Sequence, residues 1–403
     1  MNNYNILSTP LSLAAKDAEC RRPESHCVND HQKQKWTVSI HLDRAYEIRC
    51  VEPLLEPSNT TLIDIGESRA RRFIVLDDGI PDCFIEQIKL YFSSNHVMAE
   101  YFTLRGGESC KNFATLQNLI DALNVFGLNR KIEPIIIFGG GAVLDLAAFA
   151  ASIYRRGVPF IRVPTTLLSF VDAGIGIKNG INFGDTKNLI GSFTTPLAVF
   201  LDRTFLSSLS KQEMASGFGE ILKIAVACDE NILDALEANA AKFQAKHFSD
   251  EEIGRILFHS IDHMLTELCP NIYENNMNRA LDLGHTFSQV FELNLGELIL
   301  RHGEAVALDI NLSAMISMHR GILSQNETHR IARITELLGL PMTVPNVAPQ
   351  RIWDSVVERT HHRGGQQRIP IPERLGKCLF INDLTYEELV HALEKFAHKT
   401  WRD

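Results

Sequence analysis

The stretch EPIIIFGGGAVLDLAAF, which starts at Glu133, constrains the fold more than any other part of the chain. Apolar residues lead directly into the glycines of 139–141, and an apolar helical pattern that opens with Asp145 follows. This order predicts a buried strand, a tight turn and a helix, the repeating unit of a parallel α/β sheet. Glycines at such a turn let backbone N–H groups approach a pyrophosphate at the helix N-terminus, although many turns of this kind are purely structural.

Strand and helix patterns alternate around this stretch. RRFIVLDDGI and MAEYFTLRGGES predict strands, PDCFIEQIKLYFSSN and NFATLQNLIDALNVFGL predict helices, and KWTVSIHLDRAYEIRCVEPLL alternates as two strands of a hairpin. Beyond Leu209 the pattern changes to long amphipathic helices such as KQEMASGFGEILKIAVAC and DEEIGRILFHSIDHMLTELC. We therefore expect an α/β domain over residues 36–209 and an all-α domain over residues 210–403, after a flexible, polar tail over residues 1–35.

The composition excludes several classes of function. The 403 residues are 45% hydrophobic and 22% charged, which is typical of a globular protein. A net charge of -9 without a long Lys/Arg cluster argues against nucleic acid or an anionic membrane surface as a partner. No stretch approaches the roughly 20 apolar residues that span a bilayer, and no secretory signal is recognisable. Eight scattered cysteines without a CxxC pair predict reduced thiols and a cytoplasmic protein.

A second segment, VPTTLLSFVDAGIGIKNGINFGDTKNLIGSF, concentrates polar side chains among glycines. Such a composition suits the binding of a polyhydroxylated phosphate ester, because lysines and an Asn between glycine turns leave little side chain for a core. A solvated loop with incidental charges is the alternative interpretation. The side chains in question are Thr165, Thr166, Asp172, Lys178, Lys187 and Asn188.

The order and spacing of several motifs resemble the sugar phosphate cyclases, the family of 3-dehydroquinate synthase. The motifs are GGGAVLDLAAFAASIYRRG, VPTTLLSFVDAGIGIK, KNLIG, GFGEILKIA, GHTFSQVFE and HGEAVALDI, and the match runs from about Arg71 to the C-terminus. The resemblance implies a Rossmann-like NAD domain and an all-α metal-binding domain, with the active site between them. It also implies a homodimer.

The same resemblance assigns roles to individual residues. The cofactor NAD is expected to contact Asp77, Glu108, Lys111, Gly140, Gly141, Ala142, Asp145, Thr165, Thr166, Asp172, Lys178 and Lys187. Catalytic, substrate or phosphate contacts are expected for Arg156, Asp172, Lys178, Lys187, Asn188, Lys223 and Asp282.

The resemblance also implies a metal site, with Glu220, His285 and His302 as ligands of Zn²⁺ or Co²⁺. One carboxylate and two imidazoles leave open positions on the metal for substrate hydroxyls, as a catalytic site requires. The motif HSIDH is an alternative, because His259 and His263 lie one helical turn apart. Histidines on an amphipathic helix are more often solvated or capped, and the family motifs favour the first set.

The family chemistry explains why these parts occur together. A metal-bound secondary hydroxyl is oxidised by NAD⁺, phosphate leaves by β-elimination, the ketone is reduced again, and the opened sugar closes by an intramolecular aldol addition. NAD is regenerated, so the reaction has no net redox change. The leaving phosphate itself serves as a base for the elimination, so a separate protein base is not required.

Departures from 3-dehydroquinate synthase bear on the substrate. Basic residues that hold a carboxylated sugar phosphate in that enzyme correspond here to Asn278, Gln289 and Met264. Their loss favours sedoheptulose 7-phosphate, which has no carboxylate. The motifs VDAG, LTELCPNIYE and QQRIPIP, together with Asp282, resemble the 2-epi-5-epi-valiolone synthases. Demethyl-4-deoxygadusol synthases tend to carry a small residue in place of Asp282.

Other readings remain open from the sequence. GIKNG, KNLIG and Gln289 depart from the valiolone pattern, which keeps 2-epi-valiolone synthase and 3-dehydroquinate synthase as alternatives. A polyol dehydrogenase shares the glycine turn and a metal, and a non-catalytic sensor of NAD and sugar phosphate would keep both binding sites. The retained metal ligands and lysines disfavour the sensor.

Overall fold

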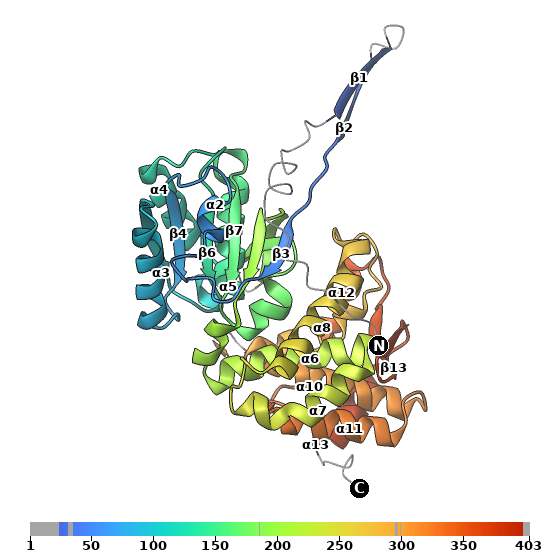
Figure 1. Cartoon of the computed structure of the whole chain (residues 1–403). Helices are drawn as coiled ribbons and strands as arrows, with labels where there is room; N and C mark the ends of the chain where they lie inside the picture. The colour runs from blue at the N-terminus through green and yellow to red at the C-terminus, as the bar shows by residue number, and fades with distance from the viewer. Residues whose placement is uncertain (1–23, 31–34, 185, 295–296, 299, 398–403) are drawn as a thin grey trace, which may run out of the picture.

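The computed structural model describes residues 24–30, 35–184, 186–294, 297–298 and 300–397. It has two parts, a sheet flanked by helices from the first half of the chain and a cluster of helices from the second half (Figure 1). A hairpin of β1 (Glu24–Asp30) and β2 (Lys35–His41) projects away from both parts.

The sheet has six parallel strands in the order β3-β10-β7-β6-β4-β5. Its central strands are mostly apolar and buried on both faces, as a parallel sheet covered by helices requires, with Arg72 and Arg162 as buried exceptions. The strands are β3 (Glu47–Cys50), β4 (Arg72–Asp77), β5 (Ala99–Leu104), β6 (Ile135–Gly139), β7 (Phe160–Pro164) and β10 (Ala198–Leu201).

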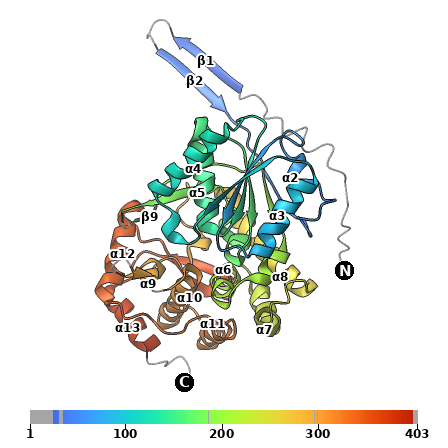
Figure 2. The ribbon, with the colours of Figure 1, turned by 90° about the vertical axis from the view of Figure 1, so that its left-hand side faces the viewer.

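Helices cover both faces of this sheet (Figure 2). Because successive strand residues point to opposite faces, β6 contributes to two cores. Ile137 packs in the cluster that contains Leu123, and Ile136 packs in the cluster that contains Phe92. The helices of this part are α2 (Thr61–Asp64), α3 (Asp82–Ser94), α4 (Phe113–Phe126) and α5 (Gly141–Ile153).

The carboxyl ends of three neighbouring strands meet at one edge of the sheet. β4 ends at Asp77, β6 at Gly139 and β7 at Pro164. Ligands of open α/β sheets bind at such an edge. After β7 come a π-helical turn, η3 (Ser169–Ala173), and an antiparallel hairpin of β8 (Lys178–Phe183) and β9 (Thr186–Phe193), of which β8 lies against α5. The lysines of the hairpin therefore lie near the sheet edge.

The second half of the chain packs around α6 and α10, which form parts of two apolar clusters. Its helices are α6 (Lys211–Cys228), α7 (Glu230–Gln244), α8 (Glu251–Leu268), α9 (Ser288–Glu292), α10 (His302–His319), α11 (Gln325–Leu337), α12 (Pro349–His362) and α13 (Tyr386–Ala397). Two small hairpins accompany them, β11 (Leu293–Asn294) with β12 (Glu297–Leu298), and β13 (Ile369–Arg374) with β14 (Lys377–Ile381).

Short helical turns connect these elements. They are η1 (Glu108–Cys110), η2 (Tyr154–Arg156), η4 (Arg203–Ser208), η5 (Cys269–Asn271) and η6 (Ala280–Asp282). Among them, η6 leads directly into the segment that contains His285.

Some details differ from the sequence predictions. The predicted hairpin over KWTVSIHLDRAYEIRCVEPLL is wrong, because β2 pairs with β1 and β3 joins the main sheet. Helix α5 begins at Gly141 rather than at Asp145, because Gly141 is already in helical conformation and the first turn precedes Asp145. Of the predicted tail, residues 24–30 form β1, and residues 1–23 and 31–34 lie outside the described residues. The boundary at 209/210 stays a prediction, and α6 begins at Lys211.

Candidate active site

Three side chains of the helical half converge on one point. Glu220 lies in α6, His285 follows η6, and His302 begins α10. One ligand atom from each lies within 4.8 Å of the others. His302 Nε2 is 3.1 Å from Glu220 Oε1, and His285 Nε2 is 3.8 Å from the same oxygen. Within the described ranges, no other group of His, Cys, Asp and Glu gathers in this way.

The crossing of α6 and α10 brings Glu220 and His302 together. A Cβ atom on Gly219 would lie 1.9 Å from the carbonyl oxygen of Gly303, and one on Gly303 would lie 1.7 Å from that of Ser216. Only glycine permits two backbones to approach this closely. Glu220 and His302 each adjoin one of these glycines, so the helix crossing sets the distance between them.

Hydrogen bonds orient both imidazoles toward the carboxylate. His285 Nδ1 lies 3.1 Å from the carbonyl oxygen of Leu283, and His302 Nδ1 lies 2.9 Å from Glu292 Oε1. Each acceptor favours a proton on Nδ1, which leaves the Nε2 lone pair free to bind a metal. Both oxygens of Glu220 are buried without an aligned hydrogen bond, so its contacts are ion pairs by distance alone. The trio therefore brings one carboxylate and two Nε2 atoms to a common point.

Lys223 places a positive charge beside the trio. Its Nζ is 3.0 Å from Asp172 Oδ2 and also contacts Glu220. Burial raises the pKa of Glu220, but Lys223 and His302 outweigh burial and hold that pKa well below its usual range. Burial favours neutral Lys223, yet the two carboxylates raise its pKa above the ordinary value. An ammonium group and a carboxylate therefore coexist here at neutral pH.

The pKa values of the two histidines are shifted in opposite directions. Burial lowers the pKa of His285 to about 3, and Lys223 contributes to this shift. Burial also favours the neutral form of His302, but Glu292 and Glu220 outweigh it and raise its pKa to about 10. The difference follows from the partners, a neutral carbonyl for one ring and carboxylates for the other.

Asp77 organises the sheet edge. Its carboxylate accepts hydrogen bonds from the backbone N–H of Gly140 at 3.0 Å and of Gly79 at 2.9 Å. Burial raises the pKa of Asp77, although these two bonds oppose the rise. A Cβ atom on Gly140 would lie 3.1 Å from Thr166 Cγ2, so the turn needs glycine for its own packing as well as for close approach by a ligand.

A buried lysine connects the sheet edge to the hairpin. Lys111 Nζ donates to Asp145 Oδ2 at 2.7 Å and to the side-chain oxygen of Asn188. Glu108 accepts a hydrogen bond from Asn182 of β8 at 2.8 Å. Burial favours neutral Lys111, but Asp145 and Glu108 raise its pKa. These contacts fix polar groups from η1, α5 and the hairpin around one space.

One cavity of about 1000 Å³ extends from the sheet edge to the metal trio. Asp77, Thr165 and Thr166 line a smaller neighbouring cavity of about 40 Å³. Arg156 is exposed and does not line either cavity, so its predicted phosphate contact stays a prediction. Of the predicted site residues, the large cavity is lined by Glu108, Lys111, Gly141, Ala142, Asp145, Asp172, Lys178, Lys187, Asn188, Lys223, Asp282, His285 and His302.

Comparison with known protein families identifies the fold. The family model of the 3-dehydroquinate synthase N-terminal domain matches residues 101–216, and the model of its C-terminal domain matches residues 217–360. The chain belongs to the 3-dehydroquinate synthase family. The predicted family and fold class are confirmed, with the two β-hairpins as additions to the predicted all-α domain.

The chain is similar to members of this family with different named activities. The 2-epi-5-epi-valiolone synthase of Streptomyces albus is 37% identical over 374 residues, 90% of each chain. A 3-dehydroquinate synthase of Prochlorococcus marinus is 32% identical over 85% of this chain and 94% of that protein. The solved 2-epi-5-epi-valiolone synthase from Streptomyces hygroscopicus subsp. jinggangensis 5008, with NAD⁺ and Zn²⁺ bound, is 34% identical. It superposes with a TM-score of 0.86 over 90% of this chain and all of that one.

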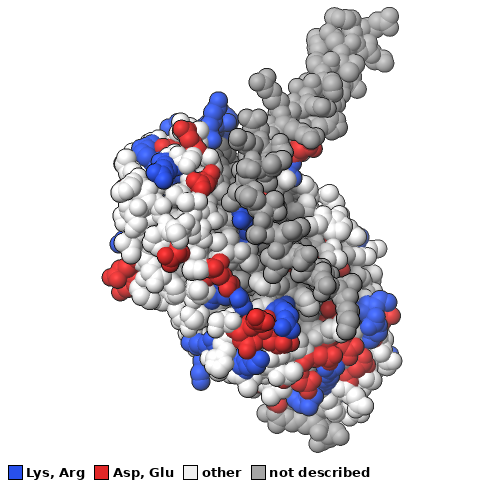
Figure 3. Space-filling model, viewed as in Figure 1, with Lys and Arg blue, Asp and Glu red and all other residues white. Residues whose placement is uncertain are grey.

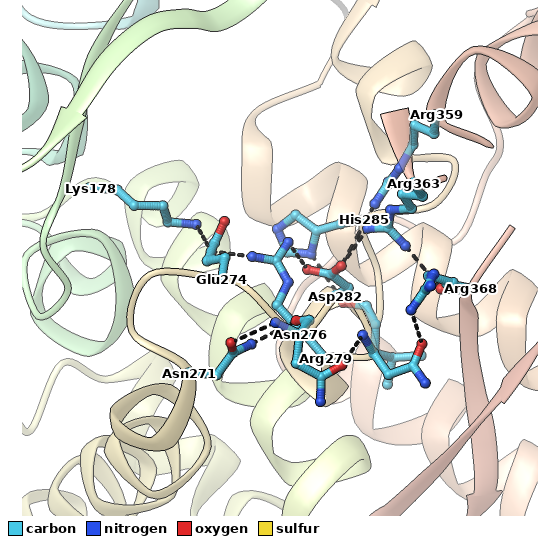
Figure 4. Close-up of polar contacts among 12 residues, drawn as sticks. Lys178, Asn271, Glu274, Asn276, Arg279, Asp282, His285, Arg359, Arg363 and Arg368 are labelled. Carbon is cyan, nitrogen blue, oxygen red and sulfur yellow. Dashed lines mark hydrogen bonds and ion pairs between the residues drawn. The ribbon is translucent and has the colours of Figure 1, made fainter. Parts of the chain in front are cut away.

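An arginine cluster surrounds Asp282 in this member of the 3-dehydroquinate synthase family (Figure 4). Arg279 Nη2 lies 2.7 Å from Asp282 Oδ1, and Arg363 donates to the other oxygen. Arg359 stands farther away, with Nη2 at 4.0 Å. Burial raises the pKa of Asp282, but these guanidinium groups outweigh burial and lower it. Asp282 thus remains a carboxylate in the cavity wall.

Glu274 extends this network to the hairpin (Figure 4). Its Oε1 accepts a hydrogen bond from Lys178 Nζ at 2.8 Å and also contacts Arg279. Burial raises the pKa of Glu274, yet the two cations outweigh burial and lower it. Both Glu274 and Arg279 line the cavity, and neither was predicted as a site residue from the sequence.

Asn278, Gln289 and Met264 all line the cavity, as the argument about the substrate requires. Two cations that the sequence did not indicate, Arg279 and Arg359, line the same cavity. Glu292 also lines it without having been predicted, although this residue ends the motif GHTFSQVFE.

The alternative metal motif HSIDH is not supported. His263 Nε2 lies 2.9 Å from Asp229 Oδ2, and neither it nor His259 belongs to a metal-holding group among the residues with described positions. Acidic and basic side chains intermingle on the helical half in Figure 3, so the described part of this face carries no extended basic patch. Helices long and apolar enough to cross a membrane are absent from the described residues.

Proposed function

We propose that the chain is a sugar phosphate cyclase that converts sedoheptulose 7-phosphate to 2-epi-5-epi-valiolone and releases phosphate. It would act as an NAD- and metal-dependent carbon–oxygen lyase. The observation that carries the proposal is the single cavity between the sheet edge and the metal trio. The 2-epi-5-epi-valiolone synthases, 34–37% identical to this chain over about nine-tenths of its length, support the choice of substrate.

The donor set fits a metal ion. Glu220 is buried with two oxygens that lack aligned hydrogen bonds, and both imidazoles present Nε2 toward it. A carboxylate with two imidazoles is a common set for catalytic Zn²⁺ and also suits Co²⁺. We assign Glu220, His285 and His302 as the ligands.

The sheet edge fits NAD. Backbone N–H groups in the first turn of α5, which begins at Gly141, can receive a pyrophosphate, while the N–H of Gly140 is held by Asp77. Glu108 and Lys111 line the adjoining part of the cavity, where a ribose would lie. Asp77, Thr165 and Thr166 border the same turn from the smaller cavity. Ala142 and Asp145 complete the proposed cofactor contacts.

When bound, these groups supply reversible hydride transfer and polarisation of a substrate hydroxyl. The chain's own residues hold the sugar between them. Lys223 keeps its proton at Nζ and can donate hydrogen bonds to substrate hydroxyls beside the trio, with Asp172 fixing its position. Asn188 and Lys187 face the sugar from the hairpin. Asp282, ionised by its arginines, lines the same cavity and can accept hydrogen bonds from hydroxyls.

The charges of the cavity favour a substrate with one anionic group. Lys111, Lys178, Lys187 and Lys223 already contact carboxylates of the chain, and Arg279 contacts two. Arg359 is the lining cation that, within the described residues, lacks a hydrogen bond. Arg359 can pair with the phosphate, and Lys178 can do so by exchanging its contact with Glu274, which leaves little positive charge for a carboxylate. Arg156 stays a predicted phosphate contact.

Synthesis of 3-dehydroquinate is the second candidate, supported by the 32% identity to enzymes of that name. Synthesis of 2-epi-valiolone differs only in product stereochemistry. A homodimer in the cytoplasm is part of the proposal, supported by the family resemblance. The described cysteine side chains are free, which suits a reducing compartment.

The test compares phosphate release from sedoheptulose 7-phosphate and from the carboxylated heptulosonate phosphate that 3-dehydroquinate synthase uses. Both substrates are assayed with NAD⁺ and Zn²⁺ under identical conditions. A buried, unpaired carboxylate costs several kcal/mol, and about 4 kcal/mol corresponds to roughly a thousandfold in kcat/KM. We therefore expect sedoheptulose 7-phosphate to be preferred on that order. Comparable rates, or the opposite preference, would return the chain to 3-dehydroquinate synthesis.

A further inference from the structure

The two histidines of the metal trio are oriented by different kinds of partner. The Nδ1 atom of His285 faces a backbone carbonyl two residues earlier in the chain. The Nδ1 atom of His302 faces the side chain of Glu292, at 2.9 Å. A side-chain partner can be substituted without a change in the backbone, so the orientation of His302 can be tested directly.

Glu292 also contacts the other half of the molecule. It ends α9 and is only 4% exposed. While Oε1 binds His302, Oε2 contacts Nζ of Lys187, which lies in β9 of the hairpin over the sheet edge. One buried carboxylate thus bridges a proposed metal ligand and a lysine of the proposed cofactor-binding half.

We propose that Glu292 is a positioning residue that holds His302 in its metal-binding orientation and links this ligand to Lys187 of the β8–β9 hairpin. The inference rests on the proposed metal site. If Glu292 has this role, the geometry of the metal site depends on the position of the β8–β9 hairpin, because the Glu292 side chain connects the two.

Two physical arguments support this role. A carboxylate that accepts the Nδ1 proton fixes the ring and makes Nε2 a better donor, and loss of such a partner typically weakens metal binding 10- to 100-fold. A carboxylate as buried as Glu292 also needs a cation, because leaving it unpaired is costly. Lys187 supplies that cation, so removal of Lys187 should loosen the hold of Glu292 on His302.

The experiment measures Co²⁺ affinity and the visible absorption spectrum of the cobalt-loaded protein, neither of which requires turnover. Glu292→Gln keeps the shape of the side chain and removes its charge. We expect about 10- to 100-fold weaker Co²⁺ binding and a shifted spectrum. The matched control is Glu304→Gln, which removes a carboxylate from the first turn of α10, the helix that begins with His302, where it accepts a hydrogen bond from the N–H of Arg301. This control should leave affinity within about twofold and the spectrum unchanged.

A double-mutant cycle tests the link to the hairpin. Lys187→Met should weaken Co²⁺ binding several-fold in the unsubstituted protein and have no further effect in the Glu292→Gln background, because Lys187 acts through Glu292. Equal effects in both backgrounds, or none in either, would overturn the link. Lys187 lies in β9, whose residues are exposed or half-buried, so this variant keeps the test available if Glu292→Gln fails to fold.

His302→Ala separates failure of this inference from failure of the proposed function. If the unsubstituted protein binds no Co²⁺, or His302→Ala binds it equally well, the proposed metal site is wrong and the inference falls with it. If His302→Ala loses Co²⁺ while Glu292→Gln retains normal affinity and spectrum, only the role of Glu292 is wrong.

Discussion

At the sheet edge, Asp77 binds the backbone N–H groups of Gly79 after its own strand and of Gly140 after the neighbouring strand, whereas at the metal trio three side chains arrive from positions 220, 285 and 302. The edge is formed by the ends of neighbouring strands, which a parallel sheet brings together in any case. The trio depends on one close helix crossing at Gly219 and Gly303.

The two regions differ in how many groups share the binding of their ligand. Many backbone groups share the binding of a cofactor at the sheet edge, so a single substitution there should weaken binding by degrees. The trio has few donor atoms, and each is used. Its two imidazoles line the cavity rather than the core, so their loss should abolish activity and leave the fold intact.

The largest effect is expected for His285→Ala. When one of three protein ligands is removed, the metal is no longer held where it can polarise the substrate hydroxyl. Phosphate release should fall by more than about a thousandfold, on the scale on which about 4 kcal/mol of lost stabilisation acts. Thermal unfolding should change little, because the ring faces the cavity and its Nδ1 contacts only the carbonyl of Leu283 among the hydrogen bonds of described residues.

His263→Ala is the control for this prediction. Its side chain is 35% exposed and pairs with Asp229 away from the cavity, so we expect activity within about twofold and a loss of stability of at most about 1 kcal/mol. Metal analysis accompanies both assays. Loss of metal from His263→Ala, together with its retention in His285→Ala, would mean that the ligands are misassigned.

A smaller effect is expected at the sheet edge for Gly140→Val. The new Cβ would lie 3.1 Å from Thr166 Cγ2, and the branched side chain would also block a pyrophosphate. NAD affinity should fall about 10- to 100-fold, and overpacking should cost about 1–3 kcal/mol of stability. Gly140→Ala, with a single added carbon, should show an intermediate loss. Calorimetric titration with NAD⁺ measures both, and unchanged affinity in the valine variant would contradict the cofactor assignment.

The sheet edge was predictable from the sequence because its signal is local. Apolar runs that end in Asp77 or in Gly139 indicate strands whose carboxyl ends meet. Hydrophobic periodicity also predicted α6 and α8 closely. It mispaired the first strands because alternation predicts a strand and not its partner, and β2 pairs with a segment assigned to the tail.

The metal trio could not be derived from spacing. Helical periodicity pointed to HSIDH, and only the family motifs indicated the observed trio, because no sequence period encodes the crossing at Gly219 and Gly303. Glu292 was missed because its role depends on the short α9 facing His302. The sequence comparison showed that Asn278 replaces a cation, but it did not indicate that the next residue, Arg279, lies in the cavity. Glu274 and Asp282 neutralise the charge of Arg279 in the folded chain.

We propose that NAD bound at one end of the cavity is reduced and then reoxidised while the metal at the other end holds the same sugar. The stoichiometry of the products from sedoheptulose 7-phosphate tests this directly. Phosphate, NADH and the organic product are measured in the same reaction, the last by NMR. We expect one phosphate released for each cyclic C7 product, with no accumulation of NADH. Stoichiometric NADH with phosphate still attached to the sugar would show a polyol dehydrogenase, and binding without any product would show a sensor. Either result would contradict the cyclase assignment.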